Sequence, residues 1–222
     1  MEKIKKYYSR SVIMAAVFLV YTILVVVVDV QPIGINGTDV GFATINSAVF
    51  SFLGVSEFWT MVTKILALFP FAACTFFALY GLRQLIKGKS FKAVSNEIWV
   101  MACFYLLCFI FYFFFEIVVI NYRPVLDDGE LAASFPSSHT VFVLCAMISA
   151  MPMMDILFPE RKLLIACVDV FCVLVSVLMV LGRFASGVHW FSDIIGGVIL
   201  SATLLSAFNG TLRMVRENPD KD

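Results

Sequence analysis

Two histidines in an otherwise apolar chain lie beside charged residues at spacings that suit chemistry. Arg183, His189 and Asp193 form the string R-x5-H-x3-D, and a spacing of four residues places the last two on one face of a helix. A carboxylate at this position can hold the imidazole in one tautomer and raise its basicity. The string therefore predicts an activated imidazole at residue 189.

Two further strings supply features that attract anions. Ser137 and Ser138 precede His139 in the string P-S-S-H, and either serine can cap a helix that starts there. The free backbone N–H groups at such a helix start are a ready anion site. Arg123 follows Glu116 by seven residues, or two helical turns, so both side chains can point toward the same face.

The composition of the chain excludes most classes of soluble protein. Of its 222 residues, 61% are hydrophobic and 14% are charged, whereas soluble domains are nearer about 45–50% and about 25%. A soluble fold of this length could not hide that excess of apolar surface. The net charge of zero gives no field that would attract a polyanion, so we expect no nucleic-acid partner. The six cysteines form no C-x-x-C pair, so we expect neither a zinc site nor a disulfide framework.

Six apolar stretches are long enough to cross a membrane as helices, which takes about 20 mostly apolar residues. They cover residues 12–28, 65–82, 98–120, 140–154, 163–181 and 190–208. The first is a retained span and not a signal peptide, because Asp29 and Pro32 follow it without a small-residue cleavage site. We therefore expect an all-α, polytopic membrane bundle of six transmembrane helices. A single domain would cover residues 1–212, followed by a polar cytoplasmic tail over 213–222.

The charge of the connecting segments predicts the orientation of the bundle. Most of the 16 Lys and Arg residues lie near the termini and in the loops on the same side, which indicates that this side is cytoplasmic. The opposite side holds Lys64, Arg123 and Arg183, together with both histidines. Because polar groups at membrane depth are costly, their gathering at the outer ends of the spans indicates a functional site there.

The first outer segment, residues 31–59, is too polar to span the membrane. Its apolar residues recur at helical spacing, at Phe42, Ile45, Val49 and Phe52. This periodicity predicts an amphipathic helix, which either lies in the outer membrane interface or packs as a cap over the bundle.

Taken together, the three strings resemble the signature of the type 2 phosphatidic acid phosphatase family, which reads K-x6-R-P, P-S-G-H and S-R-x5-H-x3-D. Here the strings read E-x6-R-P (residues 116–124), P-S-S-H (136–139) and G-R-x5-H-x3-D (182–193). The first string is degraded, because Glu116 replaces the lysine of the family. In the third, Gly182 replaces a serine.

The resemblance implies a phosphohydrolase that uses neither a metal nor another cofactor. His189 would be the nucleophile and form a phosphohistidine, with Asp193 orienting its ring. His139 would protonate the leaving oxygen and then activate water for the second step. Backbone amides and four side chains would bind the phosphoryl oxygens: Arg123, Arg183, Ser137 and Ser138.

The departures from the signature carry their own expectations. Glu116 would repel phosphate unless it is protonated or paired with a cation. Lys64 is the remaining outer cation, so we expect it to pair with Glu116 or to reach the phosphate, the alternative being that it extends to lipid headgroups. Gly182 removes one hydroxyl donor, which predicts a weakened phosphate contact. A loop formed by Asp127, Asp128 and Glu130 is expected to be solvated.

The sequence thus predicts an integral membrane lipid phosphatase of the plasma (inner) membrane, with its site on the outer face. Its partners would be membrane lipids and a lipid phosphate or diphosphate substrate of the undecaprenyl diphosphate, phosphatidylglycerophosphate or phosphatidate type. Two alternatives stay open. One is a lipid phosphotransferase, and the other is a non-catalytic lipid-binding or transport protein in which Glu116 marks lost catalysis. The oligomeric state is left open.

Overall fold

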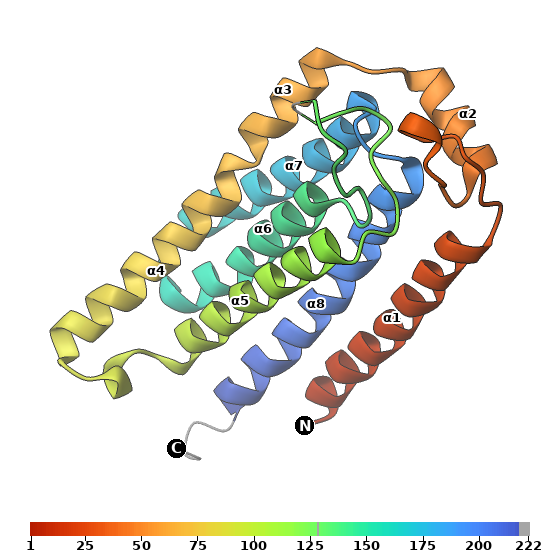
Figure 1. The fold of residues 1–222 in the computed structure, drawn as a ribbon. Helices are drawn as coiled ribbons and strands as arrows, with labels where there is room; N and C mark the ends of the chain where they lie inside the picture. Colours follow the sequence, from red (N-terminus) through yellow and green to blue (C-terminus); the bar gives the residue numbers. More distant parts are fainter. Residues whose placement is uncertain (128, 218–222) are drawn as a thin grey trace.

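The computed structural model describes residues 1–127 and 129–217, which form a bundle of long helices (Figure 1). The main helices are α1 (Glu2–Val27), α2 (Ala43–Leu53), α3 (Glu57–Leu66), α4 (Leu68–Gly88), α5 (Asn96–Ile117), α6 (Ser138–Leu157), α7 (Lys162–Ser186) and α8 (Phe191–Glu217). Two short 3₁₀ helices cover Ile35–Gly37 and Phe91–Ala93. The described residues contain isolated β-bridges but no strand, which confirms the predicted all-α class.

Six segments of the bundle are long and apolar enough to cross a membrane, as predicted. They are α1, α3 and α4 taken together as Glu57–Gly88, α5, α6, α7 and α8. The second span therefore begins earlier than the predicted residue 65, because Ser56 caps α3 by accepting a hydrogen bond from the Trp59 N–H. Pro152 lies inside α6 without ending it. The chain is a multi-pass membrane protein.

Helices α6 and α8 form the most buried part of the bundle, and α1 packs along α8 with most of its surface exposed. Two small residues let the segment before α6 lie against the start of α8. A Cβ atom at Gly196 would lie 2.5 Å from the Phe135 ring, and one at Gly197 would lie 3.1 Å from the Ser137 carbonyl oxygen. This close approach brings the α5–α6 loop onto the first turns of α8.

The loops that carry the three strings lie at the end of the bundle opposite the chain termini (Figure 1). The α5–α6 loop, the α7–α8 turn and helix α2 gather there, as six antiparallel spans require. Helix α8 runs through Glu217, so it includes residues 213–217 of the predicted tail. Residues 218–222 and Asp128 lie outside the described part of the chain.

Helix α2 is the predicted amphipathic helix of the first outer segment. Its inner face includes Asn46, whose amide nitrogen donates to the Gly41 carbonyl at 2.7 Å and to Ser192 Oγ at 2.9 Å. The Ser192 backbone N–H donates back to the Asn46 amide oxygen at 3.1 Å. On the opposite face, the Phe52 side chain is 87% exposed. The helix thus caps the bundle through one face and attaches directly to the start of α8.

Candidate active site

The turn between α7 and α8 places the R-x5-H-x3-D string. Helix α7 ends at Ser186, and Gly187 follows in the left-handed region with φ +66°, where a Cβ atom would lie 2.0 Å from the Gly54 carbonyl oxygen. Helix α8 then begins at Phe191. His189 therefore lies in the turn before the helix, and the prediction that a shared helix stacks it over Asp193 is wrong.

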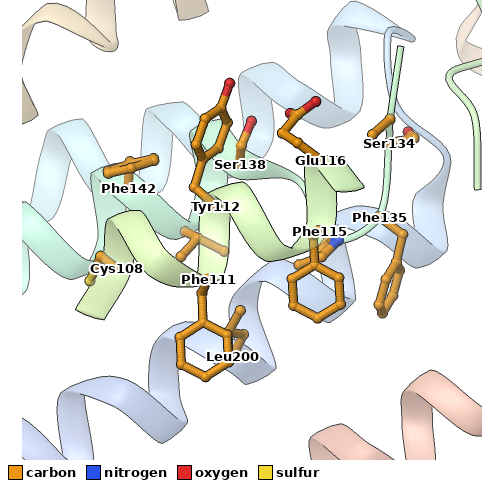
Figure 2. Close-up of a pocket in the computed structure, with 13 residues that line it drawn as sticks. Cys108, Phe111, Tyr112, Phe115, Glu116, Ser134, Phe135, Ser138, Phe142 and Leu200 are labelled. Carbon is orange, nitrogen blue, oxygen red and sulfur yellow. The ribbon is translucent and has the colours of Figure 1, made fainter. Parts of the chain in front are cut away.

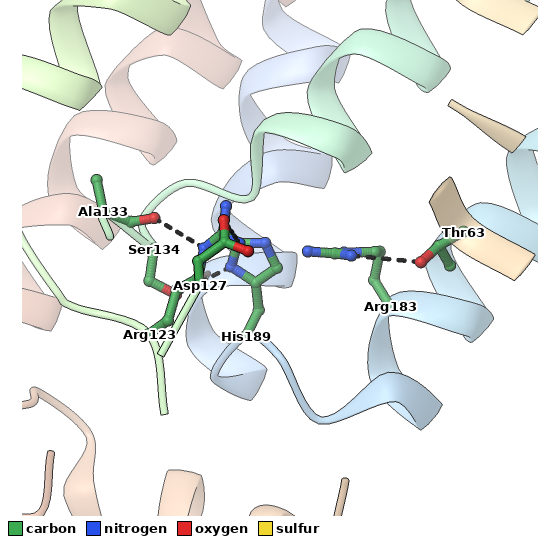
Figure 3. A network of polar contacts seen from close by, with 7 residues as sticks. All are labelled: Thr63, Arg123, Asp127, Ala133, Ser134, Arg183 and His189. Carbon is green, nitrogen blue, oxygen red and sulfur yellow. Dashed lines mark hydrogen bonds and ion pairs between the residues drawn. The ribbon is translucent and has the colours of Figure 1, made fainter. Parts of the chain in front are cut away.

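The Asp193 carboxylate is fully buried in the first turn of α8 and accepts four hydrogen bonds. The donors are Ser134 Oγ at 2.5 Å, Asn121 Nδ2 at 2.9 Å, the Trp190 N–H at 3.1 Å and Ser192 Oγ at 3.3 Å. The imidazole is not among these partners. Instead, Ser134 Oγ also lies 2.9 Å from His189 Nδ1 (Figure 3). The hydroxyl therefore stands between the side chains of His189 and Asp193.

Sequence reasoning missed Ser134 and Asn121, although both sit beside predicted strings. Asn121 lies two residues before Arg123, and Ser134 lies two residues before Pro136. Serine and asparagine are common in loops, so neither carries a signal by type alone. Their position beside the strings was the one available sign.

The electrostatic surroundings keep His189 neutral. Its side chain is 5% exposed, and burial, followed by the nearby charges of Arg183 and Arg123, holds its pKa well below the usual 6.5. Its Nε2 atom is buried and has no hydrogen-bond partner. A neutral imidazole with an unengaged ring nitrogen has the form that a nucleophile needs.

Unpaired buried polar atoms gather around this ring. Arg183 is 2% exposed, and only its Nη1 is paired, at 3.3 Å from Thr63 Oγ1. Its Nε and Nη2, together with His139 Nδ1 and His189 Nε2, are buried without partners. The Arg183 guanidinium lies between Thr63 and the His189 ring (Figure 3). Since each buried donor left unpaired costs about 1–3 kcal/mol, such a group suits an anion that would satisfy several at once.

Arg123 approaches the same place from the α5–α6 loop. Its charge acts on both imidazoles, as does that of Arg183. Its Nε donates to the Ala133 carbonyl at 3.2 Å, and its Nη1 forms an ion pair with Asp127 Oδ2 at 2.6 Å. Asp127 is therefore not simply part of a solvated loop, as the sequence suggested.

The start of α6 provides the predicted backbone donors, but neither serine caps the helix through its side chain, contrary to the prediction from the sequence. Ser137 is fully buried at the N-cap position but makes no side-chain cap, because its hydroxyl accepts from Thr140 Oγ1 at 3.0 Å. Its N–H donates to the Asp193 carbonyl oxygen at 3.0 Å. Ser138 and His139 begin the helix, where the first N–H groups have no intrahelical partner. Ser138 thus lies nearer to the open part of the site than Ser137 does.

Lys64 and Glu116 do not form the expected pair. Among residues 1–127 and 129–217, the ion pairs join Arg123 to Asp127 and the N-terminal amine to Glu217. Lys64 and Glu116 are both exposed. The charge of Lys64 nevertheless acts on His139, and Glu116 lines the cavity beside the same histidine, so both residues lie near the candidate site.

Gly182 faces helix α3. A Cβ atom there would lie 2.7 Å from Thr63 Cγ2 and 3.3 Å from the Trp59 ring. The expectation that this glycine weakens a phosphate contact stays a prediction, and the structure adds a packing role. It lets α3 approach α7 closely enough for Thr63 to reach the guanidinium of Arg183.

A cavity of about 370 Å³ opens beside His139. One end is polar, lined by Glu116, Arg123, Asp127 and Ser138, and the other is lined by apolar residues of α4, α5 and α6, including Phe71. A smaller neighbouring pocket appears in Figure 2, where Glu116 and Tyr112 lie on one side of α5 and Phe111 and Phe115 on the other. In the part of the chain that the structure describes, no three His, Cys, Asp or Glu side chains cluster as metal ligands.

Comparison with known proteins bears on these observations. The family profile of the PAP2 superfamily matches residues 114–216, a segment that contains all three strings. The fold is similar to that of the first transmembrane PAP2-type phosphatidylglycerolphosphate phosphatase from Bacillus subtilis. The TM-score is 0.62 at 17% sequence identity, and the match covers 93% of this chain and 97% of that one. Comparison with curated protein sequences finds no match. Residues 114–216 thus match the PAP2 superfamily, in agreement with the resemblance of the motifs to the type 2 phosphatidic acid phosphatase family.

Proposed function

We propose that this membrane protein is a lipid phosphatase that works through a phosphohistidine on His189, without a metal ion. The observation that carries the proposal is the set of buried, unpaired nitrogen atoms on His139, Arg183 and His189. Of these three residues, His139 lines the cavity, whose polar end also includes Arg123 and Ser138 and whose other walls are apolar. A tetrahedral anion on a hydrophobic tail has the chemistry that such a site would accept.

Each proposed step uses a side chain or backbone group at this end of the bundle. Nε2 of His189 attacks phosphorus, the bond from phosphorus to the lipid oxygen breaks, and His139 gives that oxygen a proton. In the second step His139 takes a proton from water, whose oxygen attacks the phosphohistidine and releases inorganic phosphate. Arg183, Arg123 and the first N–H groups of α6 stabilise charge on the phosphoryl oxygens throughout.

A lipid substrate is supported by the shape of the cavity. Its apolar walls come from residues within three membrane-spanning helices, such as Phe71, Phe109 and Phe142. A headgroup phosphate at the polar end would leave its tail beside these walls. Phosphatidate, phosphatidylglycerophosphate and undecaprenyl diphosphate all satisfy this description.

The distribution of basic residues supports an orientation for the site. Lys and Arg concentrate at the end of the bundle that carries the termini, so these would be cytoplasmic. The candidate site would then open on the outer face of the plasma (inner) membrane, at the level of lipid headgroups.

Release of inorganic phosphate by the purified protein tests the proposal. The protein in detergent micelles is given each of the three lipid classes, with and without a chelator. We expect wild type to release phosphate in both conditions, His189→Ala to release none, and Ser206→Ala to match wild type, because the Ser206 hydroxyl bonds only the Ala202 carbonyl within α8. The proposal would be contradicted if His189→Ala turned over as fast as wild type, or if wild type released no phosphate from any of the lipids. Transfer of the phosphoryl group to an added alcohol would instead identify a phosphotransferase.

A further inference from the structure

The side chains of His189 and Asp193 are joined through a third residue. Ser134 Oγ lies 2.9 Å from His189 Nδ1 and donates to Asp193 Oδ2 at 2.5 Å. We propose that Ser134 is a positioning residue that links Asp193 to His189 and fixes the tautomer with hydrogen on Nδ1 and a lone pair on Nε2. The inference rests on the proposed role of His189 as nucleophile and explains how its attacking nitrogen is kept free.

Counting hydrogens leads to this tautomer. An ionised carboxylate can only accept, and four donors surround that of Asp193. The serine hydroxyl has one hydrogen, which it gives to the carboxylate. Toward His189 its oxygen must therefore accept, so Nδ1 must carry a hydrogen.

The same count settles the state of the other ring nitrogen. A neutral imidazole has one such hydrogen, which leaves Nε2 with a lone pair. Nε2 is the ring nitrogen that is buried without a partner among the described residues.

The position of the serine is fixed from both sides of the loop. Its side chain is 2% exposed, and its N–H donates to the Asn121 carbonyl oxygen at 2.8 Å. The Asn121 side chain bonds the same carboxylate that Ser134 does. Phe135, next in the chain, packs against the space left by Gly196 at the start of α8. The hydroxyl is thus held relative to α8, and with it the ring of His189.

This arrangement makes Asp193 act on His189 through Ser134. Removing either the Ser134 hydroxyl or the Asp193 carboxylate would break the same connection. The decreases in kcat caused by the two single substitutions should therefore not multiply in the double variant. We expect Ser134→Ala to lower kcat about 10- to 100-fold, the usual effect of losing a group that orients a reacting imidazole, with KM changed less than about twofold. Asp193→Asn should lower kcat at least as much, and the double variant no further than Asp193→Asn alone.

The experiment combines this cycle with a measurement that needs no turnover. Phosphate release is measured for wild type, the two single variants and the double variant, with Ser206→Ala as the matched buried serine. In parallel, ¹⁵N NMR of the imidazole nitrogens is recorded on His139→Gln protein, in which His189 is the remaining histidine. We expect a protonated Nδ1 and an unprotonated Nε2 at neutral pH.

The outcomes separate this inference from the proposed function. Hydrogen on Nε2, or a double variant whose kcat falls by the product of the single effects, would overturn the role of Ser134. A wild type that releases no phosphate from any lipid would overturn the proposed function, while the NMR result would still decide the tautomer. The NMR result also decides it if Ser134→Ala does not fold.

Discussion

Adding one methyl group at Gly182 should disturb the candidate site through the packing of α3 on α7. The new Cβ atom would lie 2.7 Å from Thr63 Cγ2. Carbon atoms make favourable contact near 3.5 Å, so one helix would have to move by about 0.8 Å. The residue next to Gly182 is Arg183, whose Nη1 is bonded to the hydroxyl of the same threonine. The shift would therefore act on the guanidinium directly.

The expected effect on stability is small, and the expected effect on activity is large. Overpacking costs about 1–3 kcal/mol, and replacing glycine by alanine inside a helix returns about 1 kcal/mol, so the net loss is at most about 2 kcal/mol. Misplacing a catalytic group by about 1 Å costs up to about 100-fold in rate. We therefore expect Gly182→Ala to lower kcat/KM about 10- to 100-fold while the protein remains folded.

A second substitution removes the clash and serves as the control. Thr63→Ser deletes Cγ2 but keeps the hydroxyl that contacts Arg183. In the double variant the nearest remaining atom is the Trp59 ring at 3.3 Å, which needs a shift of only a few tenths of an ångström. We expect Thr63→Ser alone to match wild type and the double variant to recover to within about fivefold of it.

Phosphate release from a lipid phosphate, measured beside the apparent Tm of each variant, tests this reasoning. If Gly182→Ala is as active as wild type, the contact does not position Arg183. If the double variant is no better than Gly182→Ala, the clash with Thr63 is not the cause of the loss.

Three further predictions concern charge at the site. The pKa of His189 is lowered in the folded state, so the unfolded state takes up a proton first as pH falls below about 6.5, and the protein loses stability toward lower pH. The apparent Tm of wild type should therefore drop between about pH 7 and pH 5. An equally steep drop in His189→Gln would exclude this residue as the source. Asp127→Asn frees Arg123 Nη1, while Arg123 Nε stays bonded to the Ala133 carbonyl. Inorganic phosphate should then inhibit the enzyme about two- to fivefold more tightly, the range expected for loss of a partly exposed ion pair. Weaker inhibition would mean that Asp127 positions the arginine. Arg183→Lys cannot replace both unpaired guanidinium donors, so kcat/KM should fall about 100-fold, and near-normal kinetics would show that these donors do not meet the substrate.

The membrane architecture could be predicted because its signals are local. Hydropathy over about 20 residues defines each span, and the structure has a helix at every one. The differences come from contacts at helix ends. Ser56 starts α3 well before the apolar stretch, and the backbone turn at Gly187 delays α8 until Phe191. Neither depends on hydropathy.

The candidate site could be predicted only where rare residue types stand at fixed spacings. His139 and His189 are the two histidines of the chain, and the structure brings both to one end of the bundle with Arg123 and Arg183; their roles stay predictions. The supporting groups are common polar residues that meet across long stretches of chain. Ser134 reaches Asp193, and Thr63 reaches Arg183 over 120 residues, so only the folded arrangement reveals them.

The same limit explains the two departures from the motifs. Glu116 could be read only as a charge in need of a partner, and the exposed position that it takes on α5 depends on how the bundle packs. Gly182 could be read only as a missing hydroxyl. Its contact with α3 becomes visible once Thr63 and Trp59 are in place.

Identification of the phosphorylated residue during turnover is the most direct test of the account. Wild-type protein would be mixed with a lipid phosphate that it hydrolyses, quenched in alkaline denaturant within the first turnover, and mapped by mass spectrometry. The account predicts an acid-labile phosphoryl group on His189, absent from His189→Ala. A phosphoryl group on another residue, or rapid phosphate release with no phosphoprotein at any time, would contradict it.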